Sequence, residues 1–155
     1  VAGTTHLGEG RVTVWGNDPA GHPDQAWKLC YSVESDGPGL FIRTHPNSDY
    51  VIFDQTKHPD PEIQQAIKVL DKKTGKIVKT IRVTEEETAL AVHTEFNGDG
   101  SEFWVSVWVR GGKANWMKGE IVVYDTKTLE EITRIKGLET PTGKFNVYNR
   151  VHHNT

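Results

Sequence analysis

The sequence predicts an all-β fold, and three observations carry this prediction. Apolar residues recur with a period of two along most of the chain, which is the pattern of a strand with one buried face. β-Branched and aromatic residues dominate these segments, and Gly, Asn, Asp and Pro bound them. No segment has a convincing helical pattern, because the one candidate, at 58–66, begins with two prolines and leads at once into an alternating segment.

Eleven short segments carry the strand pattern, and a turn separates each from the next. In chain order they are residues 11–15, 27–33, 39–44, 50–54, 65–71, 76–83, 89–94, 102–109, 120–125, 130–136 and 144–149. Short strands joined by tight turns are typical of antiparallel sheets.

Two of these hairpins repeat one another. Residues 67–83 ("IKVLDKKTGKIVKTIRV") and 121–137 ("IVVYDTKTLEEITRIKG") share an aspartate after an apolar run, a Lys-Thr turn and an alternating return strand. Asp71 and Asp125 are 125 − 71 = 54 residues apart, and a weaker copy places Asp18 another 71 − 18 = 53 residues earlier. Four short strands in each period of this length predict β-propeller blades. The chain is therefore predicted to hold about three four-stranded antiparallel blades.

Three blades cannot close a propeller, since closed rings have at least about four. The open edges leave two alternatives, which are a piece of a larger propeller and an assembly of several copies of the chain. We favour the piece of a larger propeller.

Charge and composition exclude several classes of partner. The net charge is −3 and no run of Lys and Arg forms a basic stripe, so no nucleic-acid partner is expected. No apolar stretch approaches the roughly 20 residues that span a bilayer, so no membrane partner is expected. The single cysteine, Cys30, lies in a predicted strand, where a buried and inert thiol is expected. Gly143 and Lys144 do not form a nucleotide-binding loop, because five residues separate Gly137 from Gly143 and Phe145 follows the lysine.

Three histidines stand at loops or strand ends. They are His6 in "TTHLGEG", His45 in "IRTHPNS" and His93 in "AVHTEFN", separated by 45 − 6 = 39 and 93 − 45 = 48 residues. These spacings suggest a similar place in successive blades, so we expect the three imidazoles to approach a common axis, where propeller loops bind ligands. Three histidines could also bind zinc, although no short ligand spacing supports that alternative and no metal site is predicted.

Six stretches of the chain resemble the C-terminal part of the d1 domain of cytochrome cd1 nitrite reductases. They are "TTHLGEG", "GNDPAGHPDQAWK", "GPGLFIRTHPNSDY", "TEFNGDGSEFWVSVW", "VVYDTKTLE" and, most specific of all, "TPTGKFNVYN" at 140–149. They follow the family's order through nearly the whole chain. The resemblance implies that residues 1–155 are a C-terminal fragment holding the last three blades of an eight-bladed propeller that binds haem d1.

The resemblance also implies roles for individual residues. His6 and His45 match two histidines that lie above the haem iron, so they are expected to donate hydrogen bonds and protons to iron-bound nitrite as it becomes nitric oxide and water. Thr142 and Gly143 match positions that contact the haem, where glycine permits a close approach of the backbone. His93 stands where the family often has a haem-contacting glutamine, so it is expected to contact the cofactor.

Location and partners follow from the same resemblance. In that family a haem c domain and the histidine that ligates the d1 iron precede these blades. The expected partners are therefore the rest of the propeller and its cytochrome c domain, a second copy in a homodimer of the full-length protein, and a periplasmic electron donor. The expected location is the periplasm, and the 155 residues alone are expected to be inactive.

Two alternatives to the reductase remain open. A d1-haem biosynthesis protein shares the fold, and the presence of both His6 and His45 favours the reductase over it. A non-catalytic propeller that binds other proteins would expose Trp, Tyr and Arg on one face. Trp104, Trp108 and Trp116 could be interpreted in that way, but Trp104 and Trp108 share a face of one strand and fit blade packing better.

Overall fold

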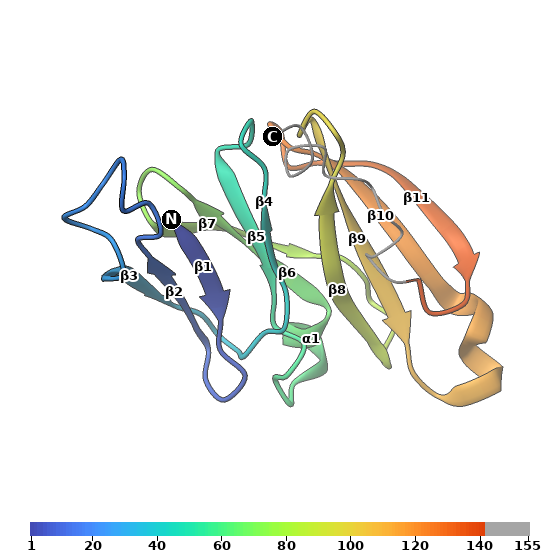
Figure 1. Ribbon diagram of the computed structural model, residues 1–155. Coiled ribbons are helices and arrows are strands. Elements are labelled where there is room, and N and C mark those ends of the chain that lie inside the picture. Colours follow the sequence, from blue (N-terminus) through green and yellow to red (C-terminus); the bar gives the residue numbers. More distant parts are fainter. Residues whose placement is uncertain (142–155) are drawn as a thin grey trace.

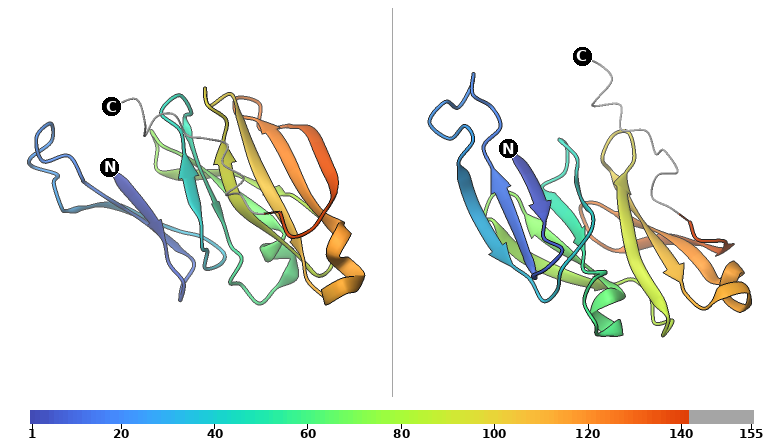
Figure 2. Two further views of the ribbon diagram at one scale, coloured as in Figure 1. Left: turned by 45° about the vertical axis from the view of Figure 1, so that its right-hand side comes forward. Right: turned by 60° about the horizontal axis from the view of Figure 1, so that its bottom comes forward.

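Three antiparallel sheets make up the part of the chain that the computed structural model describes, residues 1–141. Figures 1 and 2 show these sheets side by side, like successive blades of a propeller. The all-β prediction is confirmed, and so are the three blades. The predicted strand at 144–149 and the predicted haem contacts Thr142 and Gly143 lie outside the described residues.

Within each sheet, every strand pairs with the next one along the chain. The first sheet contains β1 (Ala2–Thr5), β2 (Arg11–Trp15) and β3 (Leu29–Glu34). The second contains β4 (Ile42–Thr44), β5 (Tyr50–Asp54), β6 (Ala66–Asp71) and β7 (Lys76–Arg82). The third contains β8 (Ala89–Phe96), β9 (Glu102–Val109), β10 (Gly119–Asp125) and β11 (Glu131–Leu138). The ten strands predicted within residues 1–141 are confirmed to within a few residues at each end.

Three details differ from the expectation. The first sheet has three strands instead of four, and β1 occupies a segment expected to be a loop, because "AGTT" lacks large apolar residues at alternate positions. A single-turn helix, α1 (Pro61–Gln64), forms where Asp60 caps the amide of Glu62 and Pro61 suits the first helical position. A 3-10 helix, η1 (Gly112–Lys118), joins β9 to β10. Within residues 1–141, no helix is both long and apolar enough to cross a membrane.

The hydrophobic core lies between the sheets, and the middle sheet is buried on both faces. Ile52 of β5 packs toward the third sheet, while its neighbour Phe53 packs toward β2 of the first. Successive side chains of a strand point to opposite faces, so both faces of β5 need apolar residues. Cys30 is partly buried against the core between the first two sheets, so it is less buried than expected.

The ends of the sheets form two rims, named here from their places in Figure 1. The upper rim holds the turns at 45–49, 72–75, 97–101 and 126–130, and the lower rim holds the turns at 6–10 and 55–65 and the connection at 35–41. Hydrogen bonds join neighbouring turns of one sheet at each rim: the Thr126 amide donates to the Ser101 carbonyl (2.9 Å) in the third sheet above, and the Ser35 amide donates to the Gly10 carbonyl (2.9 Å) in the first sheet below. The repeated aspartates accept amide hydrogen bonds in upper-rim turns, Asp71 from Thr74 and Asp125 from Thr128.

The position of the β1–β2 turn shows which place β1 takes in its blade. The β1–β2 turn lies at the lower rim, as does the β5–β6 turn, so β1 corresponds to β5, the second strand of the next blade. The first strands of the other blades, β4 and β8, lie beside each other, where Arg43 and Glu95 form an ion pair (2.8 Å). Among residues 1–141, no strand takes this first place in the blade of β1.

Candidate functional site

His45 closes the first strand of the second blade and lies at the upper rim. Its side chain is 2% exposed. The Asn47 amide donates to its Nδ1 (3.1 Å), and the Ser48 amide donates to its carbonyl (3.0 Å). Lys72 Nζ also donates to the carbonyl of His45 (2.7 Å) and to that of Ser48. The turn thus fixes both the backbone and the ring of His45.

This hydrogen-bond arrangement determines the tautomer of the His45 ring. Because Nδ1 accepts from the Asn47 amide, it carries no proton, and the neutral imidazole carries its proton on Nε2. Nε2 is buried and has no partner among the described residues. A buried donor without an acceptor costs about 1–3 kcal/mol, so Nε2–H is a candidate donor to a group that residues 1–141 do not provide.

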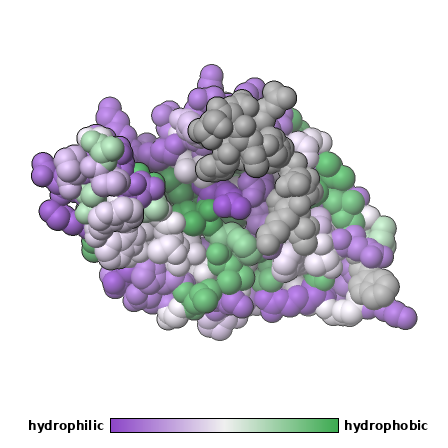
Figure 3. Space-filling view, viewed as in Figure 1, coloured by the Kyte–Doolittle hydropathy of each residue, from purple (hydrophilic) through white to green (hydrophobic). Residues whose placement is uncertain are grey.

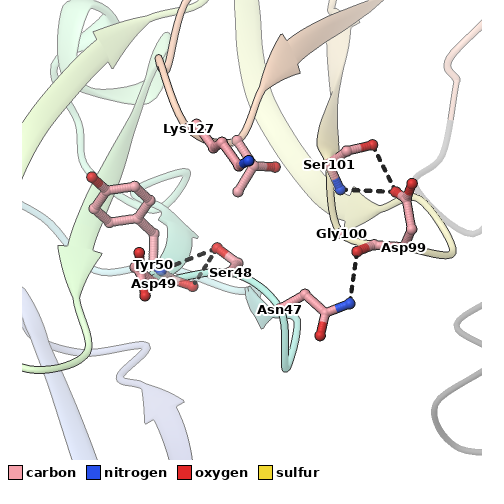
Figure 4. A pocket seen from close by; sticks show the side chains of 9 residues that line it. Asn47, Ser48, Asp49, Tyr50, Asp99, Gly100, Ser101 and Lys127 are labelled. Atoms are coloured by element: carbon pink, nitrogen blue, oxygen red, sulfur yellow. Dashed lines mark hydrogen bonds between the residues drawn. The ribbon is translucent and has the colours of Figure 1, made fainter.

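The next blade completes the surroundings of His45. Gly100, in the β8–β9 turn, has φ +76° and lies so close that a Cβ there would be 2.2 Å from Nδ1. The Phe96 ring lies 6.1 Å from the imidazole, centroid to centroid. The side-chain amide of Asn47 donates to the Asp99 carbonyl (3.0 Å), which joins the two turns directly (Figure 4).

A polar pocket of about 370 Å³ opens beside this turn, shown in Figure 4. Its lining comes from three turns of the upper rim: Asn47, Ser48, Asp49, Tyr50, Asp99, Gly100, Ser101, Thr126 and Lys127. Hydrogen bonds from the Ser101 hydroxyl and amide lower the pKa of Asp99, which keeps this carboxylate charged near neutral pH. Figure 3 shows hydrophilic residues along much of the edge of the face seen in Figure 1, with hydrophobic ones toward its middle.

The structure does not bring His6 into the His45 turn. His6 lies in the β1–β2 turn at the lower rim, where its carbonyl accepts from the Gly39 amide (3.2 Å). Gly39 and His45 are the two ends of the segment that contains β4. At the usual rise per residue of a strand, the two residues are at most about 20 Å apart. The His6 ring contacts Thr13 Oγ1 (3.1 Å) and Glu9 (3.3 Å) of its own blade. The strand before His6 corresponds to a second strand and the strand before His45 is a first strand, so turns with similar sequence spacing lie at opposite rims.

His93 lies inside β8 and not at a strand end. It has φ +54°, an uncommon conformation for a residue other than glycine, at an irregularity in the pairing of β8 with β9. Its ring centroid lies 3.9 Å from that of Phe41 and 4.9 Å from that of Trp108. His93 is therefore a buried member of an aromatic group on the inner strands, and the structure does not place it in the His45 turn.

A buried carboxylate holds the beginning of the strand that carries His45. Asp54 is 1% exposed, and it accepts hydrogen bonds from the amides of Leu40 (2.8 Å) and Phe41 (3.0 Å) and from the Thr56 hydroxyl (3.1 Å). Burial raises its pKa to about 6, although these hydrogen bonds act in the opposite direction. Asp54 fixes the lower end of the segment that the His45 turn closes above.

The sequence predicted His45 but not the residues that hold it. The Asn47 amide lies in the same turn as His45, and Lys72 reaches its carbonyl from another turn of the same blade. The close contact of Gly100 depends on two blades meeting, which no local pattern reports. The one available signal was Asp54, a carboxylate at the end of an otherwise apolar strand. Within residues 1–141, no three His, Cys, Asp or Glu side chains form a group that could hold a metal ion, and the zinc alternative has no support there.

Comparison with known proteins gives the chain a family. The family model described as "Cytochrome D1 heme domain" matches residues 1–150. A nitrite reductase of Stutzerimonas stutzeri is 32% identical over 96% of this chain and 29% of its own length. A dihydro-heme d1 dehydrogenase of Pseudomonas aeruginosa is 35% identical over 82% of this chain and 23% of its own length. The chain thus spans less than a third of these relatives.

Solved structures agree with both the fold and the family. The dihydro-heme d1 dehydrogenase NirN, solved in complex with DHE, superposes with a TM-score of 0.74 at 31% identity, covering 94% of this chain and 27% of that protein. The Dos1 propeller superposes with a TM-score of 0.60 at 12% identity, covering 88% of this chain and 33% of that one, which shows the fold alone. With three propeller blades, a match over residues 1–150 and relatives above 30% identity, the chain belongs to the cytochrome D1 heme domain family.

Proposed function

We propose that this chain forms part of the wall of a haem d1 pocket in a nitrite reductase, which converts nitrite to nitric oxide, and that His45 supplies a hydrogen bond to the substrate. Membership of the family and the similarity to a nitrite reductase over 96% of the chain support the cofactor and the reaction. The observation that carries the role of His45 is its buried Nε2–H, which has no acceptor among the described residues.

The residues present fit such a pocket. His45 offers an unsatisfied donor, and the aromatic group of Phe41, His93 and Trp108 lies on or next to the inner strands. Arg43 adds a cationic group to the same strand as His45. When bound, haem d1 supplies the iron that coordinates nitrite and passes it an electron. The chain's own contribution is to present donors and to exclude water.

The geometry favours a hydrogen-bond donor over an acid. Conversion of nitrite to nitric oxide and water consumes one electron and two protons. For His45 to act as an imidazolium acid, Nδ1 would need a proton, and that proton would meet the Asn47 amide that now donates to Nδ1. We therefore assign His45 to hydrogen bonding of a nitrite oxygen through Nε2–H, and the two protons come from elsewhere.

The test uses the full-length protein that contains these residues, with its remaining blades, loaded with haem d1. Nitrite reduction with a chemical reductant should be about 10²-fold slower in His45→Ala, the usual loss when one preorganised donor to a developing charge is removed. His6→Ala is the matched control and should stay within about twofold of the wild type, because His6 lies at the other rim. Equal losses in both variants, or a protein that binds haem d1 without reducing nitrite, would contradict the proposal.

A dihydro-haem d1 dehydrogenase is the second candidate. The 35% identity to one such enzyme and the superposition on NirN favour it. The same preparation distinguishes the two candidates, because a dehydrogenase would oxidise dihydro-haem d1 in the presence of an electron acceptor and would not turn over nitrite. Under either candidate we propose a periplasmic location, with the remaining blades and a cytochrome c domain as partners and a second copy in a homodimer.

A further inference from the structure

The ring of His45 belongs to the second blade, yet the third blade holds it. A Cβ on Gly100 would lie 2.2 Å from Nδ1, 2.8 Å from Cγ and 2.9 Å from Cε1 of His45. These distances are far below contact distance, so any side chain at Gly100 would displace the ring. The positive φ of +76° also suits glycine alone. One residue earlier, the Asp99 carbonyl accepts from the side chain of Asn47 (3.0 Å).

We propose that Gly100 is a positioning residue for His45, acting across the boundary between two blades. The β8–β9 turn presses the imidazole against its own turn, so that the Asn47 amide reaches Nδ1 and Nε2–H points away as the free donor. The bond from Asn47 to Asp99 keeps the two turns together. That this contact serves catalysis rests on the proposed function of His45, whereas the contact between Gly100 and the ring does not.

Gly100→Ala tests the contact, and Gly137→Ala is a close control. Gly137 has φ +75°, so alanine there meets the same backbone strain, but no atom lies within 4 Å of its Cβ position. Both variants should lose stability in urea through backbone strain, and Gly100→Ala should lose more because the buried ring must move. Only Gly100→Ala should change the surroundings of the His45 ring.

Amide hydrogen exchange, measured by NMR on the haem-free polypeptide, reads the ring contact directly. In Gly100→Ala we expect the Asn47 amide to exchange at least about tenfold faster, because it loses its acceptor Nδ1. The Ser48 amide is an internal reference, since it donates to the His45 backbone carbonyl and should change less than twofold. Gly137→Ala should leave both amides within twofold of the wild type.

Activity then separates positioning from packing. In the haem-loaded protein, Gly100→Ala should lower the rate of nitrite reduction at least about tenfold at unchanged haem affinity, with Gly137→Ala near the wild type. Faster Asn47 exchange without slower nitrite reduction, or no change in Asn47 exchange, would overturn the positioning role. If the wild type binds no haem d1, the proposed function fails, and the exchange data alone decide whether Gly100 holds the ring.

Asn47→Asp keeps the test decisive if Gly100→Ala does not fold. It removes the side-chain donor to the Asp99 carbonyl and leaves the Asn47 backbone amide and Gly100 in place. We expect faster exchange of that backbone amide and slower nitrite reduction, both by a smaller factor than in Gly100→Ala. Wild-type values for both measurements would overturn the proposal.

Discussion

At the scale of single residues, two buried polar side chains hold the ends of one segment. Asp54 anchors the amides of Leu40 and Phe41 where the segment begins, and the His45 turn closes it. Each side chain carries a cost, because His45 has a donor without an acceptor within residues 1–141, and Asp54 is a carboxylate without a cationic partner among its hydrogen bonds. Such costs are expected where position matters more than stability.

Asp54 gives a pH dependence whose sign can be worked out. Its pKa in the folded protein is about 6, against an ordinary value of 3.8, so between these values the folded state binds more protons than the unfolded state. The free energy of unfolding should therefore fall as pH rises from 4 to 6, by about 3 kcal/mol at most for a shift of about two units. Urea unfolding of Asp54→Asn across this range should lose that decline.

Asp71→Asn is the control for this measurement. Hydrogen bonds from Thr74 lower the pKa of Asp71, so its contribution changes with pH in the opposite direction. Removing it should leave the decline between pH 4 and 6 in place. A decline that survives in Asp54→Asn would show that another group causes it.

The residues of the site could be predicted only in part, for a physical reason. His45 stands at a strand end before Pro46, and the proline marks this position in the sequence. Whether it meets His6 depends on which strand of its blade precedes each turn. The spacing of 39 residues cannot report that, because it does not distinguish a turn after a first strand from one after a second.

At the scale of elements, the strands follow from their alternating patterns, and the exceptions follow from what these patterns omit. β5 is an apolar run up to Asp54, and β6 is apolar except for Lys68 and the final Asp71, because both faces of the middle sheet are buried along these strands. β1 has small polar residues and mostly exposed side chains, so only its pairing with β2 makes it a strand.

The core between the second and third sheets should dominate stability. Phe103 of β9 is fully buried and stacks on Tyr124 of β10, with ring centroids 5.0 Å apart. Phe103→Ala should lower the free energy of unfolding by about 3–5 kcal/mol, through lost burial and the cavity it leaves. Ile132→Ala, at a position 51% exposed, should change it by less than about 0.5 kcal/mol. Urea denaturation of both variants provides the comparison, and similar losses would contradict this account of the core.

At the scale of the whole molecule, the outer strands of each described sheet pair on one side only, and β1 is one of them. β1 pairs only with β2 among the described residues, and apolar side chains of the same sheet are exposed, Trp15 by 43% and Leu29 by 49%. An unpaired strand edge beside apolar side chains is a template for association.

The 155-residue polypeptide should therefore self-associate when it is alone in solution. Sedimentation velocity should show a mean mass that rises with concentration, and Thr4→Lys, which places a charge on β1, should reduce it. Gln25→Lys, in the exposed loop between β2 and β3, is the control for added charge and should have little effect. A monomer at all concentrations would contradict the prediction.

The contact of Gly100 with His45 also affects the order in which the protein folds during its synthesis. These residues are 100 − 45 = 55 positions apart. A ribosome must therefore add β5, β6, β7 and β8 before Gly100 can contact the imidazole. The turn that carries His45 can form early, but its ring is fixed only after the β8–β9 turn has been synthesised and has packed against it.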